Sequence, residues 1–155
     1  MKLIKKILLM IDKYARMIPA GLPLLGARLA IFVVFWRSVQ TKITGWTVFD
    51  QHLAFWNLGG STKIVFQYEY GISSDFLIHA GTLAEFFFPL MLLFGIFTRL
   101  GALGLLGVTA VIQFAVYPDA WLGAHMFWAA LLFVILREGG GQFSLDYILT
   151  REKKA

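Results

Sequence analysis

The chain has 155 residues, 59% of them hydrophobic and 15% charged, with a formal net charge of +5. This apolar content exceeds that of a usual soluble domain, and the length fits one domain. The basic residues flank apolar runs instead of forming a soluble patch, which argues against nucleic-acid binding. The absence of cysteine excludes disulfides, thiol redox chemistry and thiolate metal ligands, and no metal site is expected.

Residues 1–20 are expected to form an interfacial amphipathic helix. Residues 2–17 mix aliphatic side chains with Lys and Arg, which is typical of a helix that lies in the inner membrane interface rather than crossing the bilayer. The apolar stretch from Ile7 to Ile11 is too short to span, and no small-residue cleavage site follows it. A signal peptide is therefore rejected.

Four apolar segments follow, at about 21–40, 76–97, 100–117 and 121–137. Each reaches, or nearly reaches, the ~20 residues that a helix needs to cross a bilayer. They predict an all-α, integral membrane four-helix bundle over residues 21–138, with a cytoplasmic tail over 139–155.

A long outer loop, residues 41–75, separates the first two spans and is rich in aromatic residues. A loop of this length is usually functional or folded against its surroundings. Gly59-Gly60 is expected to divide it into two amphipathic pieces.

The distribution of Lys and Arg predicts that both ends of the chain are cytoplasmic. Ten of the 14 basic residues precede the first span, lie in the turn between the second and third spans, or follow the fourth. The opposite loops hold only Lys42 and Lys63. The positive-inside rule then gives an orientation with both termini inside, and the expected location is the plasma (inner) membrane.

Polar residues within the spans are the candidate functional groups, because an ionisable side chain in a bilayer is costly. Glu85 is the foremost candidate, since it lies roughly 14 Å from the outer end of the second span at ~1.5 Å per residue. Pro89 has no N–H, so the carbonyl of Glu85 loses its helical donor and a polar notch forms. Glu85 is the candidate catalytic residue, as proton acceptor or hydrogen-bond partner. It is also expected to form a structural ion pair with Arg28.

An aromatic-rimmed polar layer is predicted around Glu85 in the outer half of the bundle. Its candidate ligand-binding residues are Arg37, His79, Gln113, His125, Trp36, Tyr117 and Trp128. Structural roles stay open for several of them, because an arginine can snorkel to head groups and a histidine can bond a neighbouring helix. A bis-histidine haem between His79 and His125 is disfavoured, since no third feature supports it. The layer suits a flat amphipathic molecule entering from lipid, such as a quinone or a lipid head group.

Several motifs together resemble the DoxX family of small four-helix membrane proteins. They are the acid before a proline in the second span, Gly-x-x-Thr-Arg at 95–99, Ile112-Gln113, Tyr-Pro-Asp-Ala-Trp at 117–121, His-Met-Phe-Trp at 125–128, Ser-Leu-Asp at 144–146, and Trp36-Arg37-Ser38 with Lys42. The resemblance covers about 25–150. It implies a relation to subunits of thiosulfate:quinone oxidoreductase, while some relatives associate with oxidoreductase complexes or act as membrane chaperones.

The resemblance also singles out residues and a subgroup. Glu85, Arg37 and His125 fall in the family's motifs and are carried over as candidate functional positions. The segments 66–71 and 117–121 look like a subgroup found beside metal-stress and small secreted-peptide genes. That similarity implies an accessory role in redox chemistry or export.

These observations predict a membrane subunit of a redox system that binds quinone or a similar lipid-soluble carrier. Whether the chain is itself an oxidoreductase stays open, because it has no self-sufficient catalytic motif. The alternative is a non-enzymatic scaffold or assembly factor whose polar residues only fix helix packing. A transporter is the weakest reading, since one isolated carboxylate offers no relay to the inner side. A bundle this small is expected to form a homo-oligomer or to join a protein partner.

Overall fold

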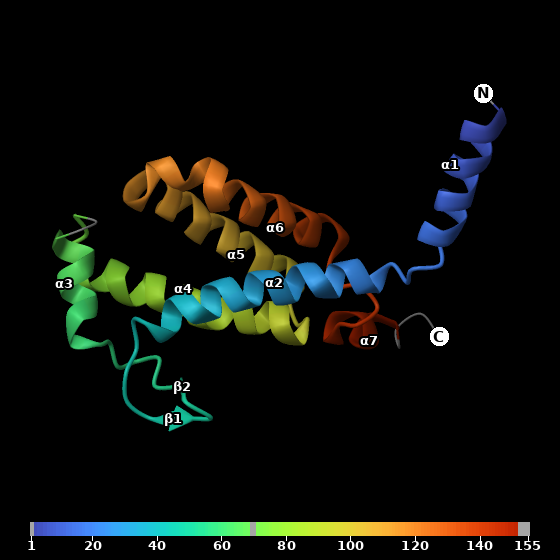
Figure 1. Ribbon diagram of the computed structural model, residues 1–155. Helices are drawn as coiled ribbons and strands as arrows, with labels where there is room; N and C mark the ends of the chain where they lie inside the picture. The colour runs from blue at the N-terminus through green and yellow to red at the C-terminus, as the bar shows by residue number, and fades with distance from the viewer. Residues whose placement is uncertain (1, 69–70, 152–155) are drawn as a thin grey trace.

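The computed structural model describes residues 2–68 and 71–151 and is mostly helical (Figure 1). Its helices are α1 (Lys2–Ala15), α2 (Gly21–Gln40), α3 (Gly60–Tyr68), α4 (Asp75–Phe94), α5 (Thr98–Val111), α6 (Met126–Glu138) and α7 (Leu145–Arg151). Glu69 and Tyr70 of the segment 66–71, and Lys153 and Lys154 of the basic tail, lie outside the described residues.

Shorter elements connect these helices. The turn from α5 to α6 passes through the π-helical η1 (Ile112–Val116), the 3-10 turn η2 (Pro118–Ala120) and the π-helical η3 (Trp121–His125). The strands β1 (Thr47–Val48) and β2 (Gln51–His52) pair antiparallel in the loop between α2 and α3. The first piece of the 41–75 loop is therefore a small hairpin with irregular chain, and the second piece is the helix α3.

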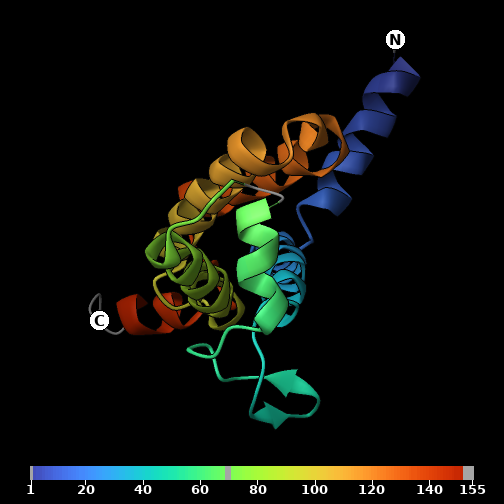
Figure 2. The same cartoon turned by 90° about the vertical axis from the view of Figure 1, so that its left-hand side faces the viewer.

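Four helical stretches are long and apolar enough to cross a membrane: Gly21–Gln40, Asp75–Phe94, Thr98–Val116 and Pro118–Glu138. They confirm the predicted four apolar spans, and the chain is a multi-pass membrane protein. The helix α2 packs against α4 and α6, and α5 packs against the same two helices, so the spans form a closed ring (Figure 2).

The two ends of the bundle carry different elements (Figure 1). The helices α1 and α7 lie at one end, called the inner end, and α3 and the hairpin lie at the other, called the outer end. Because both terminal helices lie at the same end, the chain passes along the bundle an even number of times, as four spans require. Which end faces the cytoplasm stays a prediction.

Residues from all four spans form the core, namely Ile31, Phe35, Leu92, Ala102, Leu105, Leu132 and Ile135. Lipid tails are as apolar as these side chains, so helix association in the bilayer depends on close packing and interhelical hydrogen bonds. Gly104 shows this packing, because a Cβ at that position would overlap the ring of Phe88. The helices α4 and α5 can approach this closely only with glycine there.

Arg28 closes the inner end of the bundle. Its guanidinium, fully buried, donates from Nε to the carbonyl of Leu92 at 2.7 Å and from Nη2 to Leu93 at 3.0 Å. From Nη1 it donates to the carbonyls of Gly140 at 2.8 Å and Phe143 at 2.9 Å. The last carbonyls of a helix lack intrahelical donors, so Arg28 satisfies the end of α4 and fixes the segment after α6 to it.

Asp146 completes the inner end from the other side. Its carboxylate accepts from the backbone N–H groups of Phe97 and Thr98, both at 2.8 Å, and from the Thr98 hydroxyl at 2.7 Å. A carboxylate at this place caps the first turn of α5 and complements the helix dipole. Gly95, with φ of 67°, leaves room for Arg28 and Ser144, which a Cβ there would meet at 2.5 Å. The motifs at 95–99 and 144–146 are thus in direct contact with each other.

The predicted ion pair between Arg28 and Glu85 is wrong. All four hydrogen bonds that Arg28 makes within the described part of the chain go to backbone carbonyls at the inner end. Glu85 instead pairs with Lys42 near the outer end. The prediction counted residues from the span ends, which placed the two charges at similar depth. The guanidinium instead donates to the carbonyls that lack helical donors at the end of α4.

We expect Arg28→Lys to destabilise the protein, because an ammonium group cannot reach four carbonyls in two directions. Losing two charged hydrogen bonds should lower the free energy of unfolding by roughly 3–6 kcal/mol, measured by denaturant titration in detergent. Arg37→Lys is the matched control, nine positions along the same helix on an exposed side chain. Equal stability of the two variants would contradict the role given to Arg28.

Candidate functional site

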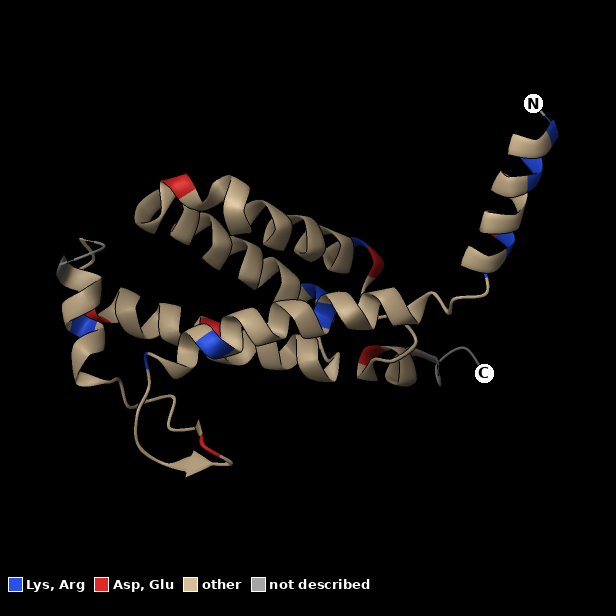
Figure 3. Cartoon of the chain, viewed as in Figure 1, with Lys and Arg blue, Asp and Glu red and all other residues tan. Residues whose placement is uncertain are grey.

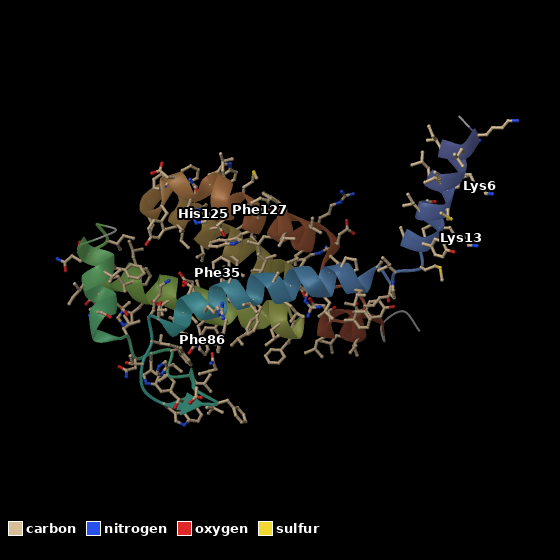
Figure 4. All side chains as sticks on the ribbon, viewed as in Figure 1. Lys6, Lys13, Phe35, Phe86, His125 and Phe127 are labelled. Atoms are coloured by element: carbon tan, nitrogen blue, oxygen red, sulfur yellow. The ribbon has the colours of Figure 1, made fainter. Side chains whose placement is uncertain are left out.

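The polar residues of the outer half fall into two groups rather than one layer. Glu85, Lys42 and Ser38 form one group, the outer ion pair, between α2 and α4. Gln113 and His125 form the other, the histidine–glutamine pair, between η1 and η3. Figure 4 shows His125 on the side of the ring made by α5 and α6, and Phe86, the neighbour of Glu85, on the side of the hairpin.

Glu85 is 4% exposed, and one oxygen of its carboxylate accepts hydrogen bonds from two donors. Lys42 donates its ammonium to Oε2, and the Ser38 hydroxyl donates to the same atom at 2.9 Å. Lys42 also donates to Ser38 Oγ at 3.2 Å, so the three side chains form a triangle. The other oxygen, Oε1, accepts no hydrogen bond from the described residues, yet it is not fully enclosed.

Lys42 also anchors the outer loop. Its backbone carbonyl accepts from the Gly59 N–H at 2.8 Å and from the Thr62 hydroxyl at 2.8 Å. The Phe66 ring of α3 lies 5.7 Å from its ammonium, within cation–π range. The helix α3 is therefore fixed over the outer end of α2 by the same residue that neutralises Glu85.

The hairpin is tied to the last turns of α2. The Gln40 side-chain amide bonds both the N–H and the carbonyl of His52, at 2.7 and 3.2 Å, as a neighbouring strand would. The Trp36 indole donates to Gln51 at 2.8 Å and packs against Phe86 with ring centroids 5.3 Å apart. These contacts bring part of the 41–75 loop against the bundle.

The histidine–glutamine pair fixes which nitrogen of His125 carries the proton. The Pro118 carbonyl can only accept, so the Gln113 atom 2.6 Å from it is the amide nitrogen, Nε2. The Gln113 oxygen therefore faces His125 Nδ1 at 2.7 Å, and Nδ1 must donate. In the neutral ring, Nε2 of His125 is then an acceptor. It has no partner among the described residues, although His125 is only 3% exposed.

Local backbone geometry creates this pair. Gln113 lies in the π-helical turn η1 and His125 in the π-helical turn η3, on either side of the Pro118 corner. A π turn widens the helix by one residue and is frequent at functional sites. Trp128 packs on the His125 ring at 4.9 Å between centroids and on Phe35 at 5.6 Å. The imidazole is thus held from one side by an amide and from another by an indole.

Other predicted site residues lie elsewhere. Arg37 is exposed on α2, and His79 bonds the Asp75 carbonyl one turn back on α4 at 2.8 Å. Tyr117 is half exposed at the corner before η2. Of the predicted ligand-binding residues, Gln113, His125 and Trp128 come together, whereas Arg37 and His79 join neither group.

Lys42 and Ser38 were not among the predicted site residues. A signal was present, because Ser38 and Lys42 are four positions apart at the end of α2 and so lie on one face. From the sequence, Lys42 is a loop charge and part of the family resemblance, and it has no predicted partner within the bundle. The length of a lysine side chain lets it reach back along the helix into the bundle.

An open hollow of about 630 Å³ lies at the inner end, between the start of α5 and the segment from Glu138 to Thr150. Phe97, Thr98, Arg99, Ser144, Asp146 and Tyr147 are among its lining residues. It therefore includes the capping contacts of the inner end and neither polar group of the outer half.

Four apolar spans, a closed ring of helices and polar pairs held between them define a small multi-pass helical membrane protein. The chain matches the DoxX family over residues 23–118, and it belongs to that family. A protein of Haemophilus influenzae described as uncharacterized is 24% identical over 117 residues, which are 68% of this chain and 78% of that protein. No solved structure matches the chain.

We expect Glu85 and Lys42 to be energetically coupled. Lys42→Met leaves a buried carboxylate without its cation, and Glu85→Gln leaves the cation without its anion, each costing roughly 3–5 kcal/mol of unfolding free energy. The double variant should recover much of that loss. Unfolding titrations of all four proteins in detergent measure the coupling.

The control for this cycle is Lys63→Met. Lys63 pairs with Asp75 at 3.0 Å, but the two side chains are 50% and 69% exposed. An exposed pair contributes at most about 1 kcal/mol. If the Glu85 and Lys42 losses were simply additive, the buried pair would not be the stabilising unit.

We expect Gln113→Leu to release the His125 tautomer, because leucine offers no acceptor to Nδ1. Nitrogen-15 NMR of the labelled imidazoles should show a proton on Nδ1 of His125 in the native protein and a mixture in the variant. The His79 signal serves as the internal control, since its ring bonds the Asp75 carbonyl. A native His125 protonated on Nε2 alone would overturn the assignment.

Proposed function

We propose that the protein is a membrane subunit of a redox system that binds the head group of quinone, or of a similar lipid-soluble carrier, in the outer half of the bundle. His125 contacts the head group, and Trp128 packs beside it. Glu85 supplies a second polar contact through Oε1. Because the chain has no cysteine, electrons pass to a bound group or to a partner subunit.

One observation carries this proposal, namely the acceptor left open on His125. Its Nε2 has no partner within the described chain, on a ring that is 3% exposed and fixed by Gln113. Binding sites for small molecules typically combine apolar walls with a few well-placed polar atoms. His125, with Trp128 packed on its ring and Phe35 packed on Trp128, has this composition.

The open atoms also indicate a redox form. Nε2 of neutral His125 and Oε1 of Glu85 are both acceptors, and the oxygens of a quinone are acceptors as well. The two hydroxyls of a quinol are donors. The proposed site therefore favours the reduced carrier over the oxidised one. On oxidation, Oε1 of Glu85 and Nε2 of His125 would each accept one hydroxyl proton, and the two electrons would pass to the bound group or partner subunit.

The remaining candidate residues have supporting roles in this proposal. Gln113 acts through His125 by fixing its tautomer, and Tyr117 lies at the aromatic rim. Trp36 packs on Phe86 and forms part of the apolar wall on the side where Glu85 lies. Arg37 and His79 lie outside both polar groups and would contact the carrier's periphery at the outer surface. In this proposal the protein lies in the plasma membrane with both chain termini in the cytoplasm, and the basic residues at the inner end support that orientation.

The test is native mass spectrometry with organic extraction of gently solubilised protein, incubated with a quinone or with the same compound after reduction. The native protein should retain the quinol at least tenfold better than the quinone. His125→Phe, which keeps a ring against Trp128, and Glu85→Gln should each weaken quinol retention. His52→Phe, in the hairpin and outside both polar groups, is the matched control and should retain it.

Two results would count against the proposal. Full quinol retention by both His125→Phe and Glu85→Gln would show that the quinol does not bind at these two residues in the outer half. Retention of neither carrier by the native protein, with a stoichiometric protein partner present, would favour the second candidate function.

That second candidate is a scaffold or assembly factor, and the hairpin favours it. Phe49, at the turn, is 95% exposed, with Trp46 and Trp56 at 64% and 63%. Phe49 and Asp50 both have positive φ, 48° and 59°, which costs energy for residues other than glycine. Such strain with apolar exposure is expected where a partner protein or lipid contacts the hairpin.

A further inference from the structure

The helix α1 stands apart from the bundle. None of its residues is buried, and Figure 1 shows it beyond the inner end, joined to α2 by a short connection. A helix of this length that packs against nothing is marginal in water. Its environment must therefore supply the stabilising contacts.

The two faces of α1 differ sharply. At 100° per residue, one half carries the aliphatic and aromatic side chains Leu3, Ile4, Ile7, Leu8, Met10, Ile11 and Tyr14. The other half carries Lys2, Lys5, Lys6, Asp12 and Lys13, with Leu9 as the apolar exception. This composition is that of a helix lying in a membrane surface.

The direction of α1 fits that surface. It runs across the bundle axis in both views, so it lies parallel to the plane of a membrane that the four spans cross (Figures 1 and 2). The basic residues lie on the face turned away from the bundle (Figure 3), and Lys6 and Lys13 point the same way in Figure 4. The apolar face is turned toward the level at which lipid surrounds the spans.

The charges of α1 are largely uncompensated. Asp12 is engaged by Arg16 at 2.9 Å, and none of Lys2, Lys5, Lys6 and Lys13 has an acidic partner among the described residues. Free ammonium groups beside an apolar face attract anionic head groups. Each lysine raises the affinity for an anionic membrane surface roughly fivefold.

We propose that α1 is a binding element for anionic phospholipid. It lies in the inner surface of the bilayer with its aliphatic face among the acyl chains and its four lysines at the phosphates. The element is independent of the carrier site, because it shares no residue with the outer half. It holds the start of α2, and with it Arg28, at a fixed depth.

The absence of cysteine allows a direct test on the full-length protein. Ile11→Cys and Leu9→Cys place one spin label on each face, at positions 57% and 60% exposed in the structure. Each labelled protein is reconstituted in nanodiscs of phosphatidylcholine with or without phosphatidylglycerol. Relaxation by oxygen, which concentrates in lipid, is compared with relaxation by a water-soluble nickel chelate.

In nanodiscs with phosphatidylglycerol, the Ile11 label should respond to oxygen and the Leu9 label to nickel. Omitting phosphatidylglycerol, or replacing the four lysines with Gln, should raise the nickel response of the Ile11 label at least fivefold. Glutamine keeps the helix propensity nearly unchanged, so lost charge and lost folding are distinguished.

Three results would overturn the proposal. Equal nickel responses at both positions would show α1 free in water. Shielding of both labels from both reagents would show a covering protein, either a second copy or a partner. Identical behaviour with and without phosphatidylglycerol would show that the anionic lipid is not the ligand.

Discussion

The contact on which the rest of the structure depends is that of the Arg28 guanidinium with four backbone carbonyls at the inner end. It joins α2 to the end of α4 and to the segment after α6, which are far apart in sequence. Asp146 adds the start of α5 to the same junction. Arg28 is fully buried there, and backbone groups that are buried at helix ends must find their partners inside the protein. One buried cation and one carboxylate thus satisfy the end of α4 and the start of α5, and they tie the segment after α6 to both.

The outer end follows a different principle, because side chains rather than backbone hold it together. Lys42 neutralises Glu85, and its backbone carbonyl also accepts a hydrogen bond from Thr62 in the first turn of α3. Replacing that lysine would therefore leave Glu85 without its cation. Gln113 and His125 pair across two π-helical turns. Every enclosed side-chain nitrogen or oxygen of the described residues has a partner. The proposed carrier site uses the acceptors left open on His125 and Glu85, so that a ligand there would break none of these contacts.

Hydropathy and charge were enough to predict the four spans, because crossing a bilayer demands length and apolarity that the sequence displays directly. Partners were harder to predict. Arg28 and Glu85 looked like an ion pair because both are charged and intramembrane, but carbonyls freed by a helix end carry no signature in the sequence. The Lys42 contact was missed because a loop residue reached back into the bundle. The pairing of Gln113 with His125 depends on π turns, and no local pattern distinguishes these from ordinary helix. The short hairpin was also missed, since its turn uses Phe49 and Asp50 rather than glycine.

The residues that carry the family resemblance divide between these two ends, and the division bears on function. Gly95, Thr98, Ser144 and Asp146 belong to the inner junction with Arg28, where each has a structural contact that any activity would require. They account for how the helices of this chain are joined, and a fold does not by itself carry a substrate. Glu85 and His125 are motif residues of the outer half, and each keeps an acceptor that receives no hydrogen bond from the described residues. Whatever distinguishes this chain from its relatives in chemistry should therefore depend on the shape and polarity around those two side chains, since the inner junction is already fully committed to holding the helices together.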